Sequence, residues 1–169
     1  MLTALRYPLP ANISLQATQE NWRIRYQYAL QPKLSCIRED KLLLIAALTQ
    51  KQSLNLLKQW LKLQAKPYLI NRSQLLGQNC GLYPQKISIR WQKTRWGSCS
   101  SLGNINLNAK LLLLPEILVD YTIYHELCHL IHRNHGPKFW QTLELHCPNS
   151  RKHHQSMQRF PLPAWCNLT

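Results

Sequence analysis

The first half of the chain begins with a segment in which apolar and polar residues alternate. From residue 22 to residue 30 large apolar side chains occupy every second position, and arginine, glutamine and alanine lie between them. This period of two is typical of a strand with one buried face. Residues 32–40 and 41–48 predict further strands, so we expect a meander here. The Pro- and polar-rich residues 1–20 predict a loose lead.

Residues 49–81 follow a helical period instead. Their apolar positions recur at intervals of three and four: Leu54, Leu57, Trp60, Leu61, Ala65 and Leu69. Such spacing predicts an amphipathic helix. Gly77 or Gly81 is expected to end it, because glycine readily adopts the left-handed conformation that closes a helix. Pro67 is expected to kink or split the helix, since it cannot donate a backbone hydrogen bond.

The second half of the chain begins with predicted strands and continues with helices. Residues 86–92 alternate like a strand, and residues 95–115 predict a hairpin around a turn at 100–104. Residues 115–133 predict a helix that opens with proline and glutamate, both favourable in a first turn. The Asn, Gly and Pro within 134–137 are expected to stop that helix.

Two shorter helices, at 138–147 and 150–160, complete the predicted elements. Together the patterns predict an α+β fold, with strands, a helix, more strands and then helices in chain order. A chain of 169 residues corresponds to one domain with a real core. We place this domain at 21–160 and treat residues 161–169 as a tail.

Hydrophobic residues make up 45% of the chain, which is ordinary for a soluble globular protein. The longest apolar runs, such as residues 42–48, are far too short to cross a bilayer, and no secretion signal is recognisable at the N-terminus. The six cysteines are widely spaced and form no Cys-x-x-Cys pair. This favours reduced thiols over disulfides or a zinc ribbon. The composition therefore indicates a cytoplasmic protein without a membrane anchor.

Basic residues outnumber acidic ones by 21 to 7, which gives a net charge of +14. The excess is concentrated in residues 41–115, which contain eleven lysines and arginines and no acidic residue. Lys58, Lys62 and Lys66 would form a like-charge stripe on a helix, which a polyanion could neutralise. No cluster has the density of a nucleic-acid-binding arm. A basic surface without a specific partner is the simpler interpretation, and nucleic acid stays open as a partner.

Four histidines and one glutamate lie within residues 125–135. On a helix, His125 and His129 would lie about 40° apart around the axis and about 6 Å along it, so both imidazoles could bind one metal ion. Catalytic zinc takes three protein ligands and leaves a fourth position for water. Glu126 is offset from the ion and could accept a proton from that water. The His-Glu-x-x-His pattern is short enough to occur by chance, but here apolar residues flank it on a predicted helix.

The spacing constrains the third ligand less. His132 shares the helical face but lies about 10 Å along the axis from His125, so we do not favour it. His135 follows the predicted helix stop, where the chain can turn and bring its ring to the ion from another direction. It is our preferred third ligand. A more distant residue stays open as an alternative: Glu144 or His146. Two later histidines are expected at the surface: His153 and His154.

Three sequence motifs occur in register: KTRWGSCSSLGNINLNAKLLLLP, HELCHL and NHGPKFW, followed by a Cys-Pro pair. In order and spacing they resemble the YgjP-like metal-dependent hydrolases over about residues 22–160, most clearly over 93–140. That family is similar to the SprT-like and WLM zinc proteases, which share the zincin core, a sheet packed on the active-site helix. The resemblance therefore implies an antiparallel or mixed sheet packed on the 115–133 helix, followed by a further helical part. The resemblance implies one zinc ion per chain, held by His125, His129 and His135, with Glu126 as the catalytic acid and base.

The resemblance also implies that the hairpin segment 96–99 lies against the active-site helix. The simplest interpretation makes Trp96 a core residue and Gly97 a bulge or close-packing position. Alternatively, the strand borders the cleft, and Trp96, Gly97 and Ser98 contact an extended peptide that adds to the sheet.

Polar residues near the motifs are candidates for supporting roles. Asn106 and Asn108 lie on one face of the second hairpin strand and could contact substrate. Asp120 could orient the imidazole of a metal ligand. Two tyrosines within one turn of the His-Glu-x-x-His motif could hydrogen-bond near the site: Tyr121 and Tyr124.

These observations predict a zinc-dependent hydrolase, and more specifically a metallopeptidase that acts on a peptide or protein substrate. Two alternatives stay open. One is a protease of the SprT-like type that docks on DNA through the basic region 41–115. The other is a non-catalytic metal-binding protein.

Overall fold

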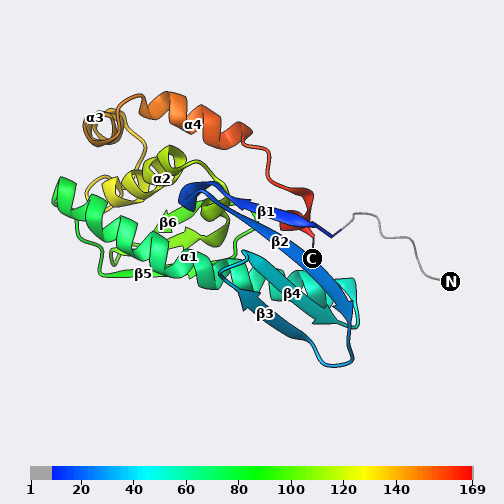
Figure 1. The fold of residues 1–169 in the computed structure, drawn as a ribbon. Coiled ribbons are helices and arrows are strands. Elements are labelled where there is room, and N and C mark those ends of the chain that lie inside the picture. Colours follow the sequence, from blue (N-terminus) through cyan, green and yellow to red (C-terminus); the bar gives the residue numbers. More distant parts are fainter. Residues whose placement is uncertain (1–8, 169) are drawn as a thin grey trace.

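The computed structural model describes residues 9–168. Within this range the fold is α+β, with two small mixed sheets and four α-helices (Figure 1). The predicted fold class is therefore confirmed. None of the helices in the described part of the chain combines the length and the apolar character that crossing a membrane requires.

The N-terminal sheet has the strand order β1-β2-β4-β3. Its strands are β1 (Asn12–Leu15), β2 (Glu20–Tyr28), β3 (Lys33–Ile37) and β4 (Leu42–Ala47). β2 and β4 pair in parallel, so the predicted meander is wrong. β4 is apolar along its whole length and takes the inner position beside β2, whereas the more polar β3 lies at the edge, where its outer backbone groups reach water.

β1 lies inside the segment that was expected to be a loose lead. It pairs antiparallel with β2, and its Ile13 and Leu15 are buried in the core. The expectation of a loose lead is therefore wrong for residues 12–20, which form β1, a short 3-10 helix and the start of β2. Residues 1–8 of that lead lie outside the described residues.

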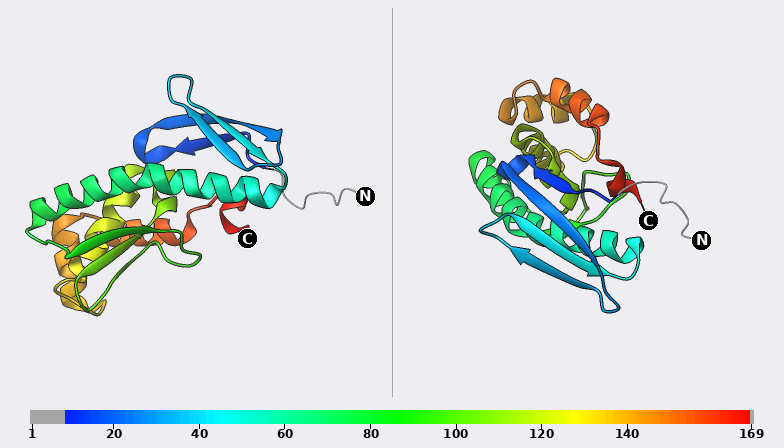
Figure 2. Two further views of the ribbon diagram at one scale, coloured as in Figure 1. Left: turned by 90° about the horizontal axis from the view of Figure 1, so that it is seen from below. Right: turned by 45° about the vertical axis from the view of Figure 1, so that its right-hand side comes forward.

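The longest element is α1 (Gln50–Cys80), which lies between the N-terminal sheet and the second half of the chain (Figure 2). It begins with a capping box between Thr49 and Gln52 and ends at Gly81, whose φ of 68° is left-handed. Pro67 does not split it. Pro67 is exposed, so the carbonyl that loses its partner can turn to water, while buried side chains on the other faces hold the helix on both sides.

The second sheet contains β5 (Lys86–Arg90), β6 (Gly97–Cys99) and β7 (Asn104–Asn108) in the order β5-β7-β6. β6 and β7 form the predicted hairpin, which leaves β6 at the sheet edge. After Asn108 the chain forms a buried 3-10 helix, η2 (Ala109–Leu113), rather than continuing as a strand.

Three helices follow: α2 (Glu116–Cys128), α3 (Pro137–His146) and α4 (Ser150–Arg159). α2 lies between α1 on one side and α3 and α4 on the other (Figure 1). It ends earlier than predicted, because the N–H of Leu130 bonds the carbonyl of Leu127 and tightens the last turn. The expected C-terminal tail contains a short 3-10 helix, η3 (Ala164–Asn167), whose Trp165 and Cys166 are buried.

Candidate active site

Three histidines converge at the C-terminal end of α2. His125 lies on its last full turn, His129 is its C-cap, and His135 lies in the loop before α3. The Nε2 atom of His135 lies 2.9 Å from Nε2 of His125 and 3.1 Å from Nε2 of His129. One nitrogen from each ring falls within 4.8 Å of the others, so the structure brings together the three predicted ligands.

The early end of α2 is what brings His135 to this position. The chain leaves the helix after His129 and turns, and Pro137 then starts α3 at a favourable first-turn position. Phe139, on α3, is fully buried beneath the cluster, and its ring centroid lies 4.7–4.9 Å from all three imidazole centroids. The motif NHGPKFW therefore supplies both the third histidine and the aromatic floor under the cluster.

Hydrogen bonds to the outer nitrogens orient two of the rings. The Nδ1–H of His129 donates to the carbonyl of His132 at 2.9 Å. The Nδ1 of His125 lies 3.3 Å from the hydroxyl of Tyr121, which lies 2.9 Å from Nδ1 of His154. With their ring protons on Nδ1, His125 and His129 present Nε2 lone pairs to the centre of the cluster.

This donor set fits a metal ion. Burial and the neighbouring His129 and His135 lower the pKa of His125 to about 3, so its ring is neutral, as a ligand must be. His135 could donate one proton to only one of the two facing lone pairs, whereas a cation would satisfy all three nitrogens. The 2.9 and 3.1 Å separations are close to the spacing of about 3.4 Å expected for nitrogens on tetrahedral zinc.

Glu126 lies next to the cluster and is only 5% exposed. Burial raises the pKa of its carboxyl to about 8. The side chain fits there because residue 97 is glycine: a Cβ atom at Gly97 would lie 2.6 Å from Oε1 and 2.7 Å from Cγ of Glu126. The edge strand β6 therefore approaches the glutamate more closely than any larger residue would allow. In this structure Gly97 is a close-packing position, as the simpler interpretation expected.

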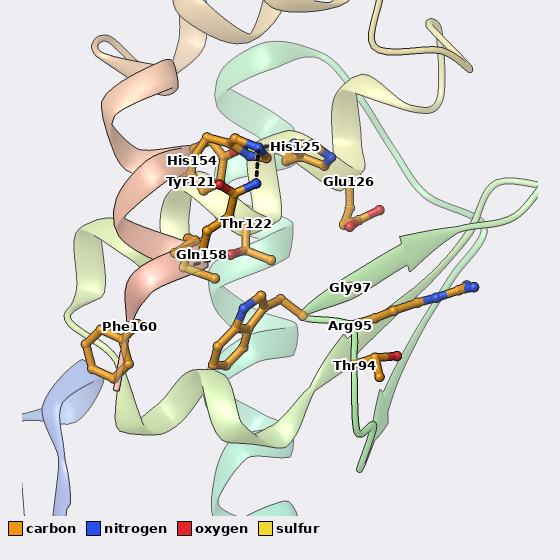
Figure 3. Close-up of a pocket in the computed structure, with 12 residues that line it drawn as sticks. Thr94, Arg95, Gly97, Tyr121, Thr122, His125, Glu126, His154, Gln158 and Phe160 are labelled. Carbon is orange, nitrogen blue, oxygen red and sulfur yellow. Dashed lines mark hydrogen bonds between the residues drawn. The ribbon is translucent and has the colours of Figure 1, made fainter. Parts of the chain in front are cut away.

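Two clefts meet at His125, Glu126 and Gly97. The larger, of about 460 Å³, extends toward α4 and is closed by side chains of α2, α4 and the segment before β6 (Figure 3). The smaller, of about 260 Å³, extends past His129 and His135 to Arg133. The histidine cluster and the carboxylate therefore lie at the middle of one continuous groove.

β6 forms one border of this groove and is an open edge. The carbonyl of Trp96 accepts a hydrogen bond from the N–H of Asn108 at 2.8 Å. Because hydrogen-bonding groups alternate between the two sides of an antiparallel strand, the backbone groups of Gly97 and Cys99 point away from β7. They lie on the side where another extended chain can pair.

Several predicted supporting residues lie elsewhere. Asp120 does not orient an imidazole; it binds Arg72 of α1 through two hydrogen bonds of 2.6 Å. Tyr124 stacks on His146, away from the cluster, with ring centroids 6.0 Å apart. Both lie on the side of α2 that faces away from β6.

Asn108 is also structural. It is buried, and its amide donates to the carbonyls of Gln92 and Arg95 while its oxygen caps η2 at Lys110. It therefore holds the loop before β6 and has no group left for substrate. Asn106 lies opposite Ser98, with its amide 3.4 Å from the serine hydroxyl.

The other histidines are also accounted for. His132 points to α3, where its Nε2 lies 3.0 Å from the hydroxyl of Thr142, so it contributes only its backbone carbonyl to the cluster. His154 lines the larger cleft rather than lying free at the surface. The alternative ligand Glu144 instead accepts hydrogen bonds from the backbone of Asn149 and Ser150.

Tyr121 was expected to hydrogen-bond near the site, and it does so as the partner of His125. Two other contributors were not singled out from the sequence for the roles they have here: Phe139 and His154. The spacing of four between Tyr121 and His125 was a usable signal, because it places both side chains on one helical face. Phe139 and His154 lie on α3 and α4, and only the packing of those helices on α2 brings them to the cluster.

Comparison with known proteins bears on the family to which the chain belongs. No curated protein matches the sequence. Among solved structures, the metallopeptidase zymogen abylysin of Pyrococcus abyssi is similar, with 23% identity and a TM-score of 0.48 over 54% of this chain and 94% of that chain. A family model described as the YgjP-like metallopeptidase domain matches residues 8–160, the range that holds every strand and helix from β1 to α4.

Proposed function

Since the chain belongs to the family of YgjP-like metallopeptidase domains, we propose that it hydrolyses peptide bonds with one zinc ion held by His125, His129 and His135. Membership of the family makes the protein a metal-dependent peptidase; the identity of the metal, its ligands and the catalytic group are our proposal. The observation that carries it is the convergence of three imidazole nitrogens beside the buried Glu126, in a groove bordered by an open strand.

In this proposal Glu126 moves the protons. A bound zinc ion would polarise the scissile carbonyl and lower the pKa of water to about 7. The charge of such an ion would lower the pKa of the Glu126 carboxyl, which burial raises. The ionised carboxylate then accepts a proton from the attacking water as a general base and delivers it to the nitrogen of the departing amine as a general acid. Its burial removes competing solvent, and Gly97 fixes where the carboxylate can lie.

The peptide backbone is proposed to pair with β6. The outward N–H and C=O groups of Gly97 and Cys99 supply the hydrogen bonds of strand addition, and Trp96 and Ser98 border the two clefts. An extended chain held this way passes Glu126 and the histidines with its carbonyl groups accessible. Asn106 stays a candidate contact through Ser98.

The choice of zinc rests on the donor set. Imidazole nitrogens suit zinc, copper, iron or nickel rather than magnesium or calcium, and zinc commonly occupies catalytic sites with three protein ligands. The cellular location is proposed to be the cytoplasm, where thiols stay reduced, since all six cysteines are unpaired. Chelation should abolish cleavage, and zinc should restore it more effectively than magnesium.

The central test compares Glu126→Gln with the wild-type protein. Casein or peptide cleavage and bound zinc are measured for both. We expect about a 10²–10⁴-fold loss of cleavage, because general acid–base catalysis contributes that much, with zinc retained. Glu39→Gln, at an exposed carboxylate, is the matched control and should change neither quantity.

Two outcomes would overturn the proposal. If wild type and Glu126→Gln cleave equally, Glu126 is not the catalytic base. If neither cleaves while both hold zinc, the protein is the non-catalytic metal binder considered above. The burial of the Glu126 carboxylate beside the cluster favours the catalytic interpretation over the purely structural one. Burying a carboxylate costs free energy, and a purely structural metal site would gain nothing in return.

Docking on DNA receives less support. Within the basic region 41–115, Lys41 pairs with Glu20 and Arg72 with Asp120. Lys58 packs over Trp91 and binds the carbonyl of Leu168, so it does not continue a stripe with Lys62 and Lys66. Nucleic acid binding stays a prediction, and retention on a DNA column that falls steeply with salt would support it.

A further inference from the structure

We propose that the larger cleft beside Glu126 is a specificity pocket for a large apolar side chain, contributed by the peptide residue on one side of the scissile bond. The inference deepens the proposed function of the same site and rests on it. It names the substrate class as peptides that carry leucine, methionine or phenylalanine at that position.

The geometry of the groove determines which peptide residue the larger cleft would contact. His125, Glu126 and Gly97 line both clefts, so the reacting carbonyl would lie where they meet. A peptide that pairs with β6 advances by about 3.4 Å per residue. The residues flanking the scissile bond therefore lie on opposite sides of the junction, and the one on the α4 side faces the larger cleft.

The inner wall of this cleft is apolar. Thr122 on α2 is 4% exposed and Met157 on α4 is 5% exposed. The Thr122 hydroxyl donates to the carbonyl of Leu118 at 2.9 Å, so it has no proton to offer to a ligand. Trp96 and Phe160, both half-buried, complete the wall. A side chain that enters here leaves water and meets mainly carbon and sulfur atoms.

Three polar side chains of the cleft are already engaged with one another. The hydroxyl of Tyr121 lies between His125 and His154, and the amide nitrogen of Gln158 lies 3.0 Å from Nε2 of His154 (Figure 3). An uncharged polar side chain at the inner wall would lose its water without a hydrogen bond in return, since Thr94 and Arg95 lie at the exposed rim. An acidic side chain would meet Arg95 only at the exposed rim, with its charge held over the apolar wall.

The size of the cleft supports a bulky occupant. Its volume of about 460 Å³ exceeds that of the smaller cleft, about 260 Å³, which Arg133 lines on the other side of the junction. Binding pockets for small ligands span about 300–1,000 Å³. Glycine or alanine would leave most of the larger cleft unfilled, so selection should act against small residues as well as polar ones.

The first experiment profiles cleavage of a mixed peptide library by the zinc-loaded protein. We expect leucine, methionine and phenylalanine at one position next to the cleaved bond, and cleavage about tenfold or more slower when that residue is glycine or aspartate, because pocket contacts discriminate on this scale. The position of the preference also shows which side of the bond faces α4.

Two variants connect the preference to this cleft. Phe160→Ala and Met157→Ala enlarge it and should shift the preference toward tryptophan. Phe160 is half-buried and should tolerate truncation better than the core residue Met157. The Phe160→Ala variant can therefore still test the pocket if Met157→Ala does not fold. Leu145→Ala, at a side chain 77% exposed on α3, is the matched control and should leave the profile unchanged.

A binding measurement separates this inference from the proposed function. Calorimetry on Glu126→Gln compares two peptides that differ only in leucine or aspartate next to the scissile bond. Tighter binding of the leucine peptide, lost in the double variant with Phe160→Ala, supports the pocket. Cleavage without positional preference, or a preference that both cleft variants leave intact, overturns the pocket while the peptidase function stands. Absence of wild-type cleavage overturns both.

Discussion

The two faces of α2 carry polar residues of similar type that have different partners and roles. On the face toward β6, Tyr121, His125 and Glu126 lie at the groove. On the face toward α1, Asp120 pairs with Arg72, and Glu116 adds a second contact to the same guanidinium at 3.2 Å. In the proposed function the first face binds the metal and moves a proton, whereas the second face holds the helix against α1.

The difference shows that two adjacent residues of a helix can have different roles, one at the proposed catalytic site and one in holding the fold together. Asp120 and Tyr121 are neighbours in sequence, yet only Tyr121 contacts a ligand imidazole. Each residue turns the helix by about 100°, so a carboxylate and a hydroxyl that look equivalent in sequence point to different partners. Substitutions on the groove face should therefore change metal binding and catalysis, and substitutions on the α1 face should change stability.

Removal of the third imidazole is expected to have the largest effect. His135→Ala should lower zinc affinity by more than about 100-fold, because even the loss of a group that supports a ligand costs 10–100-fold. The measurement is a competition titration with a chromogenic chelator. His132→Ala is the matched control, because its ring points to Thr142 and only its backbone carbonyl reaches His129. If His132→Ala weakens zinc more than His135→Ala does, the ligand assignment is wrong.

Addition of a methyl group to the edge strand β6 should have the next largest effect, on catalysis. In Gly97→Ala the new Cβ would lie 2.6 Å from Oε1 of Glu126, so strand or carboxylate must move. We expect about a 100-fold fall in kcat/KM, which is typical when a catalytic group is displaced by about an ångström. Overpacking of a buried site should also lower the free energy of unfolding by about 1–3 kcal/mol.

The control for this change is another glycine of the same region. Gly136→Ala adds its methyl group where no atom lies within 4 Å, at a φ of −74° that alanine accepts. Peptide cleavage and thermal unfolding are compared for the two variants. Equal effects at both positions would mean that the close approach of β6 to Glu126 has no special role.

The sequence predicted the elements of the site better than their surroundings. Helical spacing was enough to place His125 and His129 on one face with Glu126 offset beside them, and the Asn-Gly-Pro stop was enough to expect a turn that returns His135. The parallel pairing of β2 with β4 was missed, because alternation reveals which face of a strand is buried and not which strand lies beside it. β1 was missed because four residues carry too little pattern.

The supporting residues were harder to predict because their roles depend on tertiary contacts. Asp120 was expected to orient the imidazole of a metal ligand. Instead its carboxylate accepts hydrogen bonds from Arg72 of α1, which lies 48 residues earlier in the chain. Asn108 was expected at the substrate, but it holds the loop that leads into β6. Neither partner can be inferred from spacing, since both are brought together only when separate elements pack.

Removal of the hydroxyl group that orients His125 should lower zinc affinity less than removal of a metal ligand does. Tyr121→Phe removes the partner of the Nδ1 atom of His125 and leaves the aromatic packing. We expect zinc affinity to fall by about tenfold, the lower end of the range for such supporting groups. Tyr124→Phe, on the other face, should leave affinity unchanged, since its ring stacks on His146 away from the cluster. Equal losses in both variants would contradict the division between the faces.

The smallest effect is expected on the α1 face, and it should appear only in stability. In Asp120→Asn the carboxylate becomes a neutral amide that can keep one of the two 2.6 Å contacts with Arg72. Loss of one charge-assisted hydrogen bond in a partly buried pair should lower the free energy of unfolding by about 1–2 kcal/mol, measured by urea denaturation. Zinc affinity and kcat/KM should not change, because the groove face keeps every contact. A tenfold loss of zinc affinity in this variant would instead show that the ion pair with α1 helps to position the metal ligands, and that the two faces of α2 act as one unit.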